Sequence, residues 1–205
     1  MTSPAPVRCW PESGGGPAPP ATARRRALFL DRDGVINVNH GYVHTPAETR
    51  FLPGIFDLTG AAREAGFIII VATNQAGIAR GFYGVAQFID YTRWMHEEFA
   101  ARGVCIEATY FCPHHPVAGV GEGLRDCDCR KPKPGMLLAA AARFGIDLGA
   151  SVMVGDSDSD AAAAAAAGVG RTFILARDDA SVEPPAQRVQ SLAEVQDLLG
   201  RGIPA

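Results

Sequence analysis

The chain has 205 residues, of which 47% are hydrophobic and 20% are charged, and its formal net charge is −3 at pH 7. This length suits one globular domain with a single core and excludes two ordinary domains. The mildly acidic charge disfavours nucleic-acid binding, which needs a basic surface, and no apolar run reaches the roughly 20 residues of a membrane-spanning helix. We therefore expect a soluble protein that acts on a small molecule.

Residues 1–26 differ in composition from the rest of the chain. They are rich in proline, glycine and alanine and end in three consecutive arginines. They lack the apolar residues that offset ordering entropy, and they lack the apolar segment of a signal peptide. We expect residues 1–26 to form a disordered leader and residues 27–205 to form one domain. We expect a monomer, because no exposed apolar stripe demands a partner.

Short apolar runs alternate with helical patterns from residue 27 onward. Compact β-branched or aromatic runs suit strands that are buried on both faces, and they occupy residues 27–31, 67–73, 108–112, 151–156 and 171–176. Helical spacing of apolar residues, with proline or glycine at several boundaries, predicts helices at 53–65, 85–102, 160–167 and 192–199, and after Pro134. This alternation predicts an α/β fold, a doubly wound three-layer sandwich with a central parallel sheet.

The first predicted strand ends in two carboxylates, Asp31 and Asp33, followed by Gly34. Strand alternation starts both carboxylates on one side of the sheet, and open α/β sheets bind ligands beyond the carboxyl ends of their strands. Carboxylate oxygens are the ligands that Mg²⁺ prefers. Two acids alone also fit a solvated turn.

Two further strand ends and a lysine point to the same edge of the sheet. Thr73, Asn74 and Gln75 end the second strand with a hydroxyl and amides, which can donate hydrogen bonds to phosphoryl oxygens. A later strand ends in Asp156, and Lys131 can supply the fixed positive charge that phosphoryl transfer needs. The combined set predicts phosphoryl-transfer chemistry.

This set of residues, from Asp31 to Asp160, resembles the four signature motifs of the haloacid dehalogenase superfamily of phosphotransferases. The resemblance implies that Asp31 attacks phosphorus to form an aspartyl phosphate, and that Asp33 acts first as the acid and then as the base. It implies an orienting role for Asp160 in its loop. It assigns the phosphoryl group to Thr73 and Lys131, and it assigns Mg²⁺ to Asp31, Asp156 and the main-chain carbonyl of Asp33.

Three cysteines and one histidine lie within 18 residues, at Cys112, His114, Cys127 and Cys129. This set matches the ligand chemistry of tetrahedral structural Zn²⁺, and three thiolates leave no obvious position for a catalytic water. We predict a zinc ion that staples the loop insertion at 112–129, with His115 as the competing ligand. The clustered, odd-numbered cysteines fit a metal site in a reducing cytoplasm better than a disulfide framework.

A zinc loop in this scaffold narrows the resemblance to the D-glycero-D-manno-heptose-1,7-bisphosphate 7-phosphatases, over nearly the whole chain after residue 26. The segments that carry it are FLDRDGVIN (29–37), HGYV (40–43), TNQ (73–75), GIARG (77–81), CPHHP (112–116) and CDCRKP (127–132). The resemblance implies removal of the 7-phosphate in nucleotide-activated heptose biosynthesis, without a large cap domain. It assigns substrate contacts to Asn39, His40, Gly41, Tyr42, Thr73, Asn74, Gln75, Ala76, Arg130 and Lys131.

Two alternatives stay open at this point. Histidinol-phosphate phosphatases share the Asp-x-Asp start and the zinc loop, and a zinc-bearing scaffold that binds phosphosugars without turnover is an alternative of another class. Ser157 stands where some relatives have lysine, and Val35 and Ala76 replace hydroxyl residues, so the exact sugar and anomer stay open. His40 and Tyr42 also fit simple loop packing.

Overall fold

A seven-stranded sheet forms the centre of the computed structural model, which describes residues 7–8, 24–175 and 185–200. The strand order is β1-β4-β3-β2-β5-β6-β7, and every neighbouring pair is parallel except β1 and β4. The strands are β1 (Val7–Arg8), β2 (Arg26–Leu30), β3 (Phe67–Asn74), β4 (Ile106–Cys112), β5 (Val152–Gly155), β6 (Arg171–Leu175) and β7 (Gln187–Val189).

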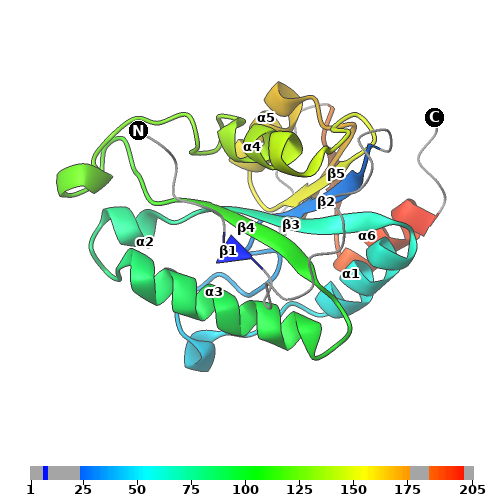
Figure 1. Cartoon of the computed structure of the whole chain (residues 1–205), viewed down its shortest axis with the longest axis horizontal. Coiled ribbons are helices and arrows are strands. Elements are labelled where there is room, and N and C mark those ends of the chain that lie inside the picture. The colour runs from blue at the N-terminus through cyan, green and yellow to red at the C-terminus, as the bar shows by residue number, and fades with distance from the viewer. Residues whose placement is uncertain (1–6, 9–23, 176–184, 201–205) are drawn as a thin grey trace.

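Helices cover both faces of the sheet, as Figure 1 shows. Alternation along β2 sends Leu28 and Leu30 into one core and Ala27 and Phe29 into the other. The first core includes residues of α1 (Ile55–Glu64), α3 (Val85–Ala100) and α6 (Leu192–Gly200), and the second includes residues of α4 (Gly135–Phe144) and α5 (Asp158–Ala167). This arrangement confirms the predicted doubly wound three-layer sandwich.

Several elements differ from the prediction. Helix α5 begins at Asp158 rather than at residue 160, because Ser157 and Asp160 form a capping box at its start. The short helix α2 (Ala76–Ala79), the 3₁₀ helices η1 (Pro46–Glu48) and η2 (Gly121–Gly123), and the strand β7 were not predicted. Elements of three or four residues carry too little periodicity for a sequence pattern to reveal them.

The described part of the predicted leader contains regular backbone pairing. Val7 and Arg8 pair with β4 as the antiparallel edge strand β1. The backbone of Arg25 also exchanges hydrogen bonds with Gly145 and Asp147, and β2 starts at Arg26. Strand β2 therefore begins one residue before the predicted boundary at residue 27, and Arg26 is paired with Phe67 of β3. The rest of the leader, residues 1–6 and 9–23, lies outside the described residues.

Two loop insertions flank the carboxyl ends of the central strands. One connects β2 to α1 and contains η1, and the other connects β4 to α4 and contains η2. Within the described residues these insertions carry no separate cap domain. No described helix is long and apolar enough to cross a membrane.

Candidate active site

The site lies where the carboxyl ends of β2, β3 and β5 meet. Strand β2 stands between β3 and β5, and the chain builds the sheet outward from it in both directions, which makes this edge a topological switch point. Gly34 has a φ of 94°, and a Cβ at this position would overlap the carboxylate of Asp156. Only glycine permits this close approach of the two acidic loops.

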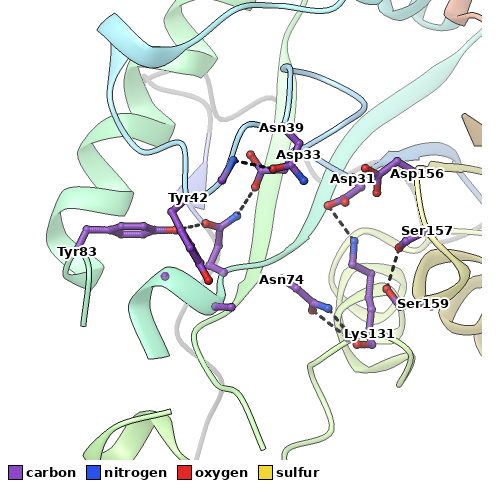
Figure 2. Close-up of a pocket in the computed structure, with 14 residues that line it drawn as sticks. Asp31, Asp33, Asn39, Tyr42, Asn74, Tyr83, Lys131, Asp156, Ser157 and Ser159 are labelled. Carbon is purple, nitrogen blue, oxygen red and sulfur yellow. Dashed lines mark hydrogen bonds and ion pairs between the residues drawn. The ribbon is translucent and has the colours of Figure 1, made fainter. Parts of the chain in front are cut away.

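A pocket of about 350 Å³ opens at this edge (Figure 2). Most of the predicted site residues line it, namely Asp31, Asp33, Asn39, Gly41, Tyr42, Asn74, Gln75, Ala76, Lys131 and Asp156. Gly77, Tyr83, Ser157 and Ser159 also line it, although none of them was predicted as a contact. Ser157 and Ser159 follow the strand β5 directly, so their place after a predicted strand end was an available signal.

Three of the predicted contacts do not line this pocket. Thr73 is 1% exposed, and its hydroxyl accepts a hydrogen bond from Gln75 at 2.8 Å. His40 is exposed on the loop after β2. The guanidinium of Arg130 donates a hydrogen bond to the main-chain oxygen of His114 at 3.0 Å. These three residues are next to lining residues along the chain, but they are not part of the pocket wall.

The ammonium group of Lys131 is the buried cation of the site. Its Nζ lies 2.9 Å from Asp31 Oδ1 and 2.5 Å from Asp160 Oδ1, and it donates to the main-chain oxygen of Ala72 at 2.7 Å. Burial alone would lower the pKa of Lys131, but the attraction of Asp31 and Asp160 outweighs it and raises that pKa. Lys131 therefore stays charged in the site.

Burial raises the pKa of Asp31 to about 7, against the opposing attraction of Lys131. The neighbouring carboxylates of Asp160 and Asp33 add to the rise. This carboxylate depends on nearby positive charge to remain ionised, and a divalent cation at the same oxygens would supply more of it.

The carboxyl group of Asp33 lies in a different environment from that of Asp31 (Figure 2). Its Oδ2 accepts hydrogen bonds from Arg32 Nη2 at 2.6 Å, from Arg32 Nε at 3.1 Å and from Gln75 Nε2 at 3.2 Å. Its Oδ1 accepts one from Asn37 at 3.0 Å. Two acids that are two residues apart therefore have separate sets of partners.

Three carboxylates gather closely enough to hold a metal ion. Oxygen atoms of Asp31, Asp156 and Asp160 lie within 4.8 Å of one another. Asp160 also accepts hydrogen bonds from Ser157 Oγ and from Lys131, and Asp31 pairs with the same Lys131 ammonium. The Asp33 side chain is turned to Arg32, which is compatible with a main-chain role for this residue. Hard carboxylate oxygens in this arrangement fit Mg²⁺.

The second cluster joins Cys112, His114, Cys127 and Cys129. The Sγ atoms of Cys112 and Cys129 lie 3.5 Å and 3.4 Å from that of Cys127, and His114 Nδ1 lies 3.8 Å and 3.6 Å from Cys112 and Cys129. Zn–S bonds of about 2.3 Å imply tetrahedral edges of about 3.8 Å. The four donors therefore lie close to the spacing of a tetrahedral zinc site, with the two Sγ–Sγ distances slightly shorter than the edges of such a site.

His115 points away from this cluster. Its Nδ1 accepts hydrogen bonds from the backbone N–H groups of Val117 and Ala118, at 3.2 Å and 2.9 Å. Within the cluster, the hydrogen bond of the Cys112 thiol to Cys129 lowers the pKa of the Cys129 thiol. A thiolate, which is the form that binds a metal, is therefore favoured at Cys129. Of the two histidines considered from the sequence, the structure places His114 with the thiols.

Comparisons with known proteins place these features in a family. A family model described as "HAD-hyrolase-like" matches residues 128–194. The chain is 48% identical to the D-glycero-beta-D-manno-heptose-1,7-bisphosphate 7-phosphatase of Vibrio cholerae over 82% of this chain and 89% of that protein. It is 51% identical to the D-glycero-alpha-D-manno-heptose-1,7-bisphosphate 7-phosphatase of Burkholderia mallei over 77% of this chain and 84% of that protein.

A solved structure gives the same result for the fold. The D,D-heptose 1,7-bisphosphate phosphatase of B. bronchiseptica, solved with magnesium and phosphate, superposes with a TM-score of 0.74 at 32% identity. The alignment covers 86% of this chain and 98% of that one.

Replacing Asp160 with alanine is expected to destabilise the protein by about 3–5 kcal/mol, because it leaves the buried Lys131 ammonium without one of its two carboxylates. Asp158→Ala is the matched control, since Asp158 is exposed in the first turn of the same helix, and it should cost about 1 kcal/mol or less. Urea unfolding of both variants measures the difference. Equal free energies of unfolding would contradict the buried-pair interpretation.

Proposed function

We propose that this chain, which belongs to the D-glycero-D-manno-heptose-1,7-bisphosphate 7-phosphatase family, hydrolyses the 7-phosphate of a D-glycero-D-manno-heptose 1,7-bisphosphate. The observation that carries the proposal is the Asp31–Lys131 pair, 2.9 Å apart, on the wall of a pocket at the carboxyl end of the central strand. The product would supply nucleotide-activated heptose biosynthesis.

In the first half-reaction, a carboxylate oxygen of Asp31 attacks phosphorus and the bond from phosphorus to the sugar oxygen breaks. Asp33 gives its proton to that leaving alkoxide, and an aspartyl phosphate remains on Asp31. Lys131 stabilises the negative charge of the attacking carboxylate and of the phosphoryl group.

In the second half-reaction, the ionised Asp33 accepts a proton from a water molecule while the water oxygen attacks phosphorus. The bond between phosphorus and Asp31 breaks, and inorganic phosphate is released. Asp33 ends protonated, and Asp31 is again a carboxylate. The two carboxyl groups thus return to the states in which the cycle began.

Asp31, Asp156 and the main-chain carbonyl of Asp33 would hold Mg²⁺ in this proposal. When bound, the ion neutralises phosphoryl charge between carboxylates that would otherwise repel the substrate. Asp160 stays with Lys131 and the start of α5, so its part is to fix the loop that carries Asp156.

The remainder of the substrate would lie against the loop after β2. Asn39, Gly41 and Tyr42 line the pocket on that side, and Asn74 and Gln75 line it at the end of β3. Outside the pocket, the guanidinium of Arg130 would bind the second phosphate of the substrate through a bidentate contact. Arg80 adds positive charge on this side, since its guanidinium lies over the Tyr42 ring at 5.8 Å. Burial lowers the pKa of His115, and the charges of Arg130 and Arg80 lower it further.

Zinc would act as a structural ion in the cluster of three cysteines and His114. Its thiolates need a reducing compartment, which supports a cytoplasmic location for the enzyme. Cys129 is two residues before Lys131, so the metal would anchor the chain segment that delivers the catalytic cation. We propose that the enzyme works as a monomer.

The proposal predicts Mg²⁺-dependent release of phosphate from heptose 1,7-bisphosphate, measured for both anomers beside histidinol phosphate. Family relatives of both anomeric specificities match this chain, so both anomers belong in the assay. Asp31→Asn should lower the rate by roughly 10⁴-fold or more, because the amide cannot replace the nucleophile. Preference for histidinol phosphate would contradict the heptose assignment, and no turnover of either substrate by the metal-loaded protein would favour the scaffold alternative.

Arg130→Ala is expected to lower kcat/KM for the bisphosphate by about 10- to 100-fold, which is the value of one charge-assisted contact. Heptose 7-phosphate, which lacks the second phosphate, should lose little. Arg125→Ala on the same loop is the control, because Arg125 is exposed and has no part in the proposed phosphate contact. An equal loss with both substrates would instead indicate that Arg130 acts through its hydrogen bond to the His114 main chain.

The purified chain should contain about one zinc ion, measured by elemental analysis. Cys127→Ser removes a buried ligand and should lose most of that zinc together with thermal stability. Cys105→Ser should retain both, because Cys105 lies outside the cluster. Full zinc content in Cys127→Ser would rule out the predicted ligand set.

A further inference from the structure

Arg32 stands between the two catalytic acids in sequence, yet its side chain is buried in the core. It is the largest fully buried side chain of the described residues, at 1% exposure. Its guanidinium lies 5.6 Å from the ring centre of Phe88 and 5.2 Å from that of Tyr91, both on α3. Burying a charge this deeply costs folding free energy, and an unpaired buried charge is strongly destabilising. The partner of Arg32 is therefore important.

The partner of Arg32 is the carboxyl group of Asp33. Arg32 Nη2 and Nε lie 2.6 Å and 3.1 Å from Asp33 Oδ2, and Gln75 Nε2 donates to the same oxygen at 3.2 Å. The opposite oxygen, Oδ1, receives one hydrogen bond, from Asn37 at 3.0 Å. The donors are therefore distributed unequally over the two oxygens.

This inequality determines which oxygen is free to exchange a proton. A carboxylate oxygen offers about two lone-pair positions. Three N–H groups occupy both positions of Asp33 Oδ2, whereas a single N–H from Asn37 leaves one position of Oδ1 open.

We propose that Arg32 is a positioning residue, which occupies Asp33 Oδ2 so that Asp33 Oδ1 carries out both proton transfers. The inference rests on the proposed function. Oδ1 holds the proton that passes to the leaving sugar oxygen as the phosphorus–oxygen bond breaks. The same atom takes the proton of the water that attacks the aspartyl phosphate. Arg32 itself exchanges no proton and does not touch the substrate.

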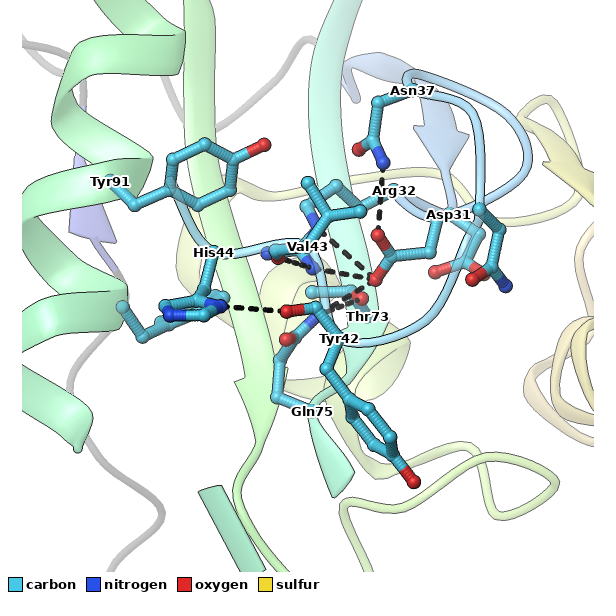
Figure 3. A network of polar contacts seen from close by, with 12 residues as sticks. Asp31, Arg32, Asn37, Tyr42, Val43, His44, Thr73, Gln75 and Tyr91 are labelled. Atoms are coloured by element: carbon cyan, nitrogen blue, oxygen red, sulfur yellow. Dashed lines mark hydrogen bonds and ion pairs between the residues drawn. The ribbon is translucent and has the colours of Figure 1, made fainter. Parts of the chain in front are cut away.

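Arg32 also connects this acid to the loop that lines the pocket. Its Nη2 donates to the main-chain oxygen of Val43 at 2.7 Å, directly after the lining residues Gly41 and Tyr42 (Figure 3). One planar guanidinium thus fixes Asp33 and the loop relative to each other. A lysine at this position would keep the charge, but it cannot reproduce the forked contact of Nε and Nη2.

The test compares Arg32→Lys with the wild type on two leaving groups. An alkoxide leaving group needs the proton of Asp33, whereas p-nitrophenolate leaves without one, and kcat/KM reports only the steps through the departure of the leaving group. Arg32→Lys should lower kcat/KM for the sugar phosphate by about 100-fold, which is within the usual contribution of a general acid, and for p-nitrophenyl phosphate by less than about 5-fold. Equal losses for the two substrates would overturn the proposal and assign Arg32 to packing alone.

Two control variants give the largest and the smallest difference expected between the two substrates. Asp33→Asn removes the acid and should show the largest difference between the substrates. Arg102→Lys should match the wild type on both, although Arg102 likewise lies over an aromatic ring, that of Phe56 at 4.4 Å, and pairs with a carboxylate, that of Glu98 at 2.9 Å. Arg102 is exposed and does not line the pocket.

A second variant keeps the test decisive if Arg32→Lys does not fold. Tyr83→Phe removes the hydroxyl that donates to Gln75 Oε1 at 2.6 Å and so loosens the other donor to Asp33 Oδ2. It should show the same bias towards loss of the alkyl substrate, by about 5-fold or more. The absence of any bias in a folded Tyr83→Phe protein would overturn the proposal. The alkyl substrate in these assays is the one that the wild type hydrolyses, either heptose bisphosphate or histidinol phosphate. The wild-type assay therefore tests the heptose assignment, and the comparison of variants tests the role of Arg32 independently of it.

Discussion

The buried contact of Lys131 with two carboxylates is the interaction on which the rest of the site depends. The ammonium group joins Asp31 after β2, the main-chain oxygen of Ala72 in β3, and Asp160 in α5. A charge at 3% exposure is tolerated only because these partners satisfy it. One nitrogen atom therefore joins β2, β3 and α5. The proposed mechanism assigns the fixed positive charge to the same atom, so stability and the proposed phosphate binding would have one origin.

The segment that carries Lys131 is itself held at two places. The side chain of Asn74 bonds both the N–H and the carbonyl of Lys131, each at 3.0 Å. Two residues earlier in the chain, Cys129 belongs to the cluster with the spacing of a zinc site. Side-chain contacts and the cysteine–histidine cluster thus position Lys131 in a loop that has little regular structure of its own.

Asp31 and Asp33 show how one short motif places two carboxyl groups in different surroundings. Burial and Lys131 act on Asp31, whereas Asp33 is surrounded by the N–H donors of Arg32, Gln75 and Asn37. Different surroundings for two neighbouring carboxyl groups are the usual way in which enzymes separate a nucleophile from an acid. The sheet edge places both groups at one pocket, and the surrounding side chains distinguish them.

The sequence by itself determined the five main strands, the helices that cover them, the sheet edge that carries the site and the composition of both clusters. These follow from local periodicity and from acids and cysteines at fixed spacing, which a chain carries before it folds. Only the tertiary structure turned the Thr73 hydroxyl to Gln75 and buried Arg32 beside Asp33. The direction of a side chain depends on partners that are distant in sequence, and these contacts form only when the chain folds.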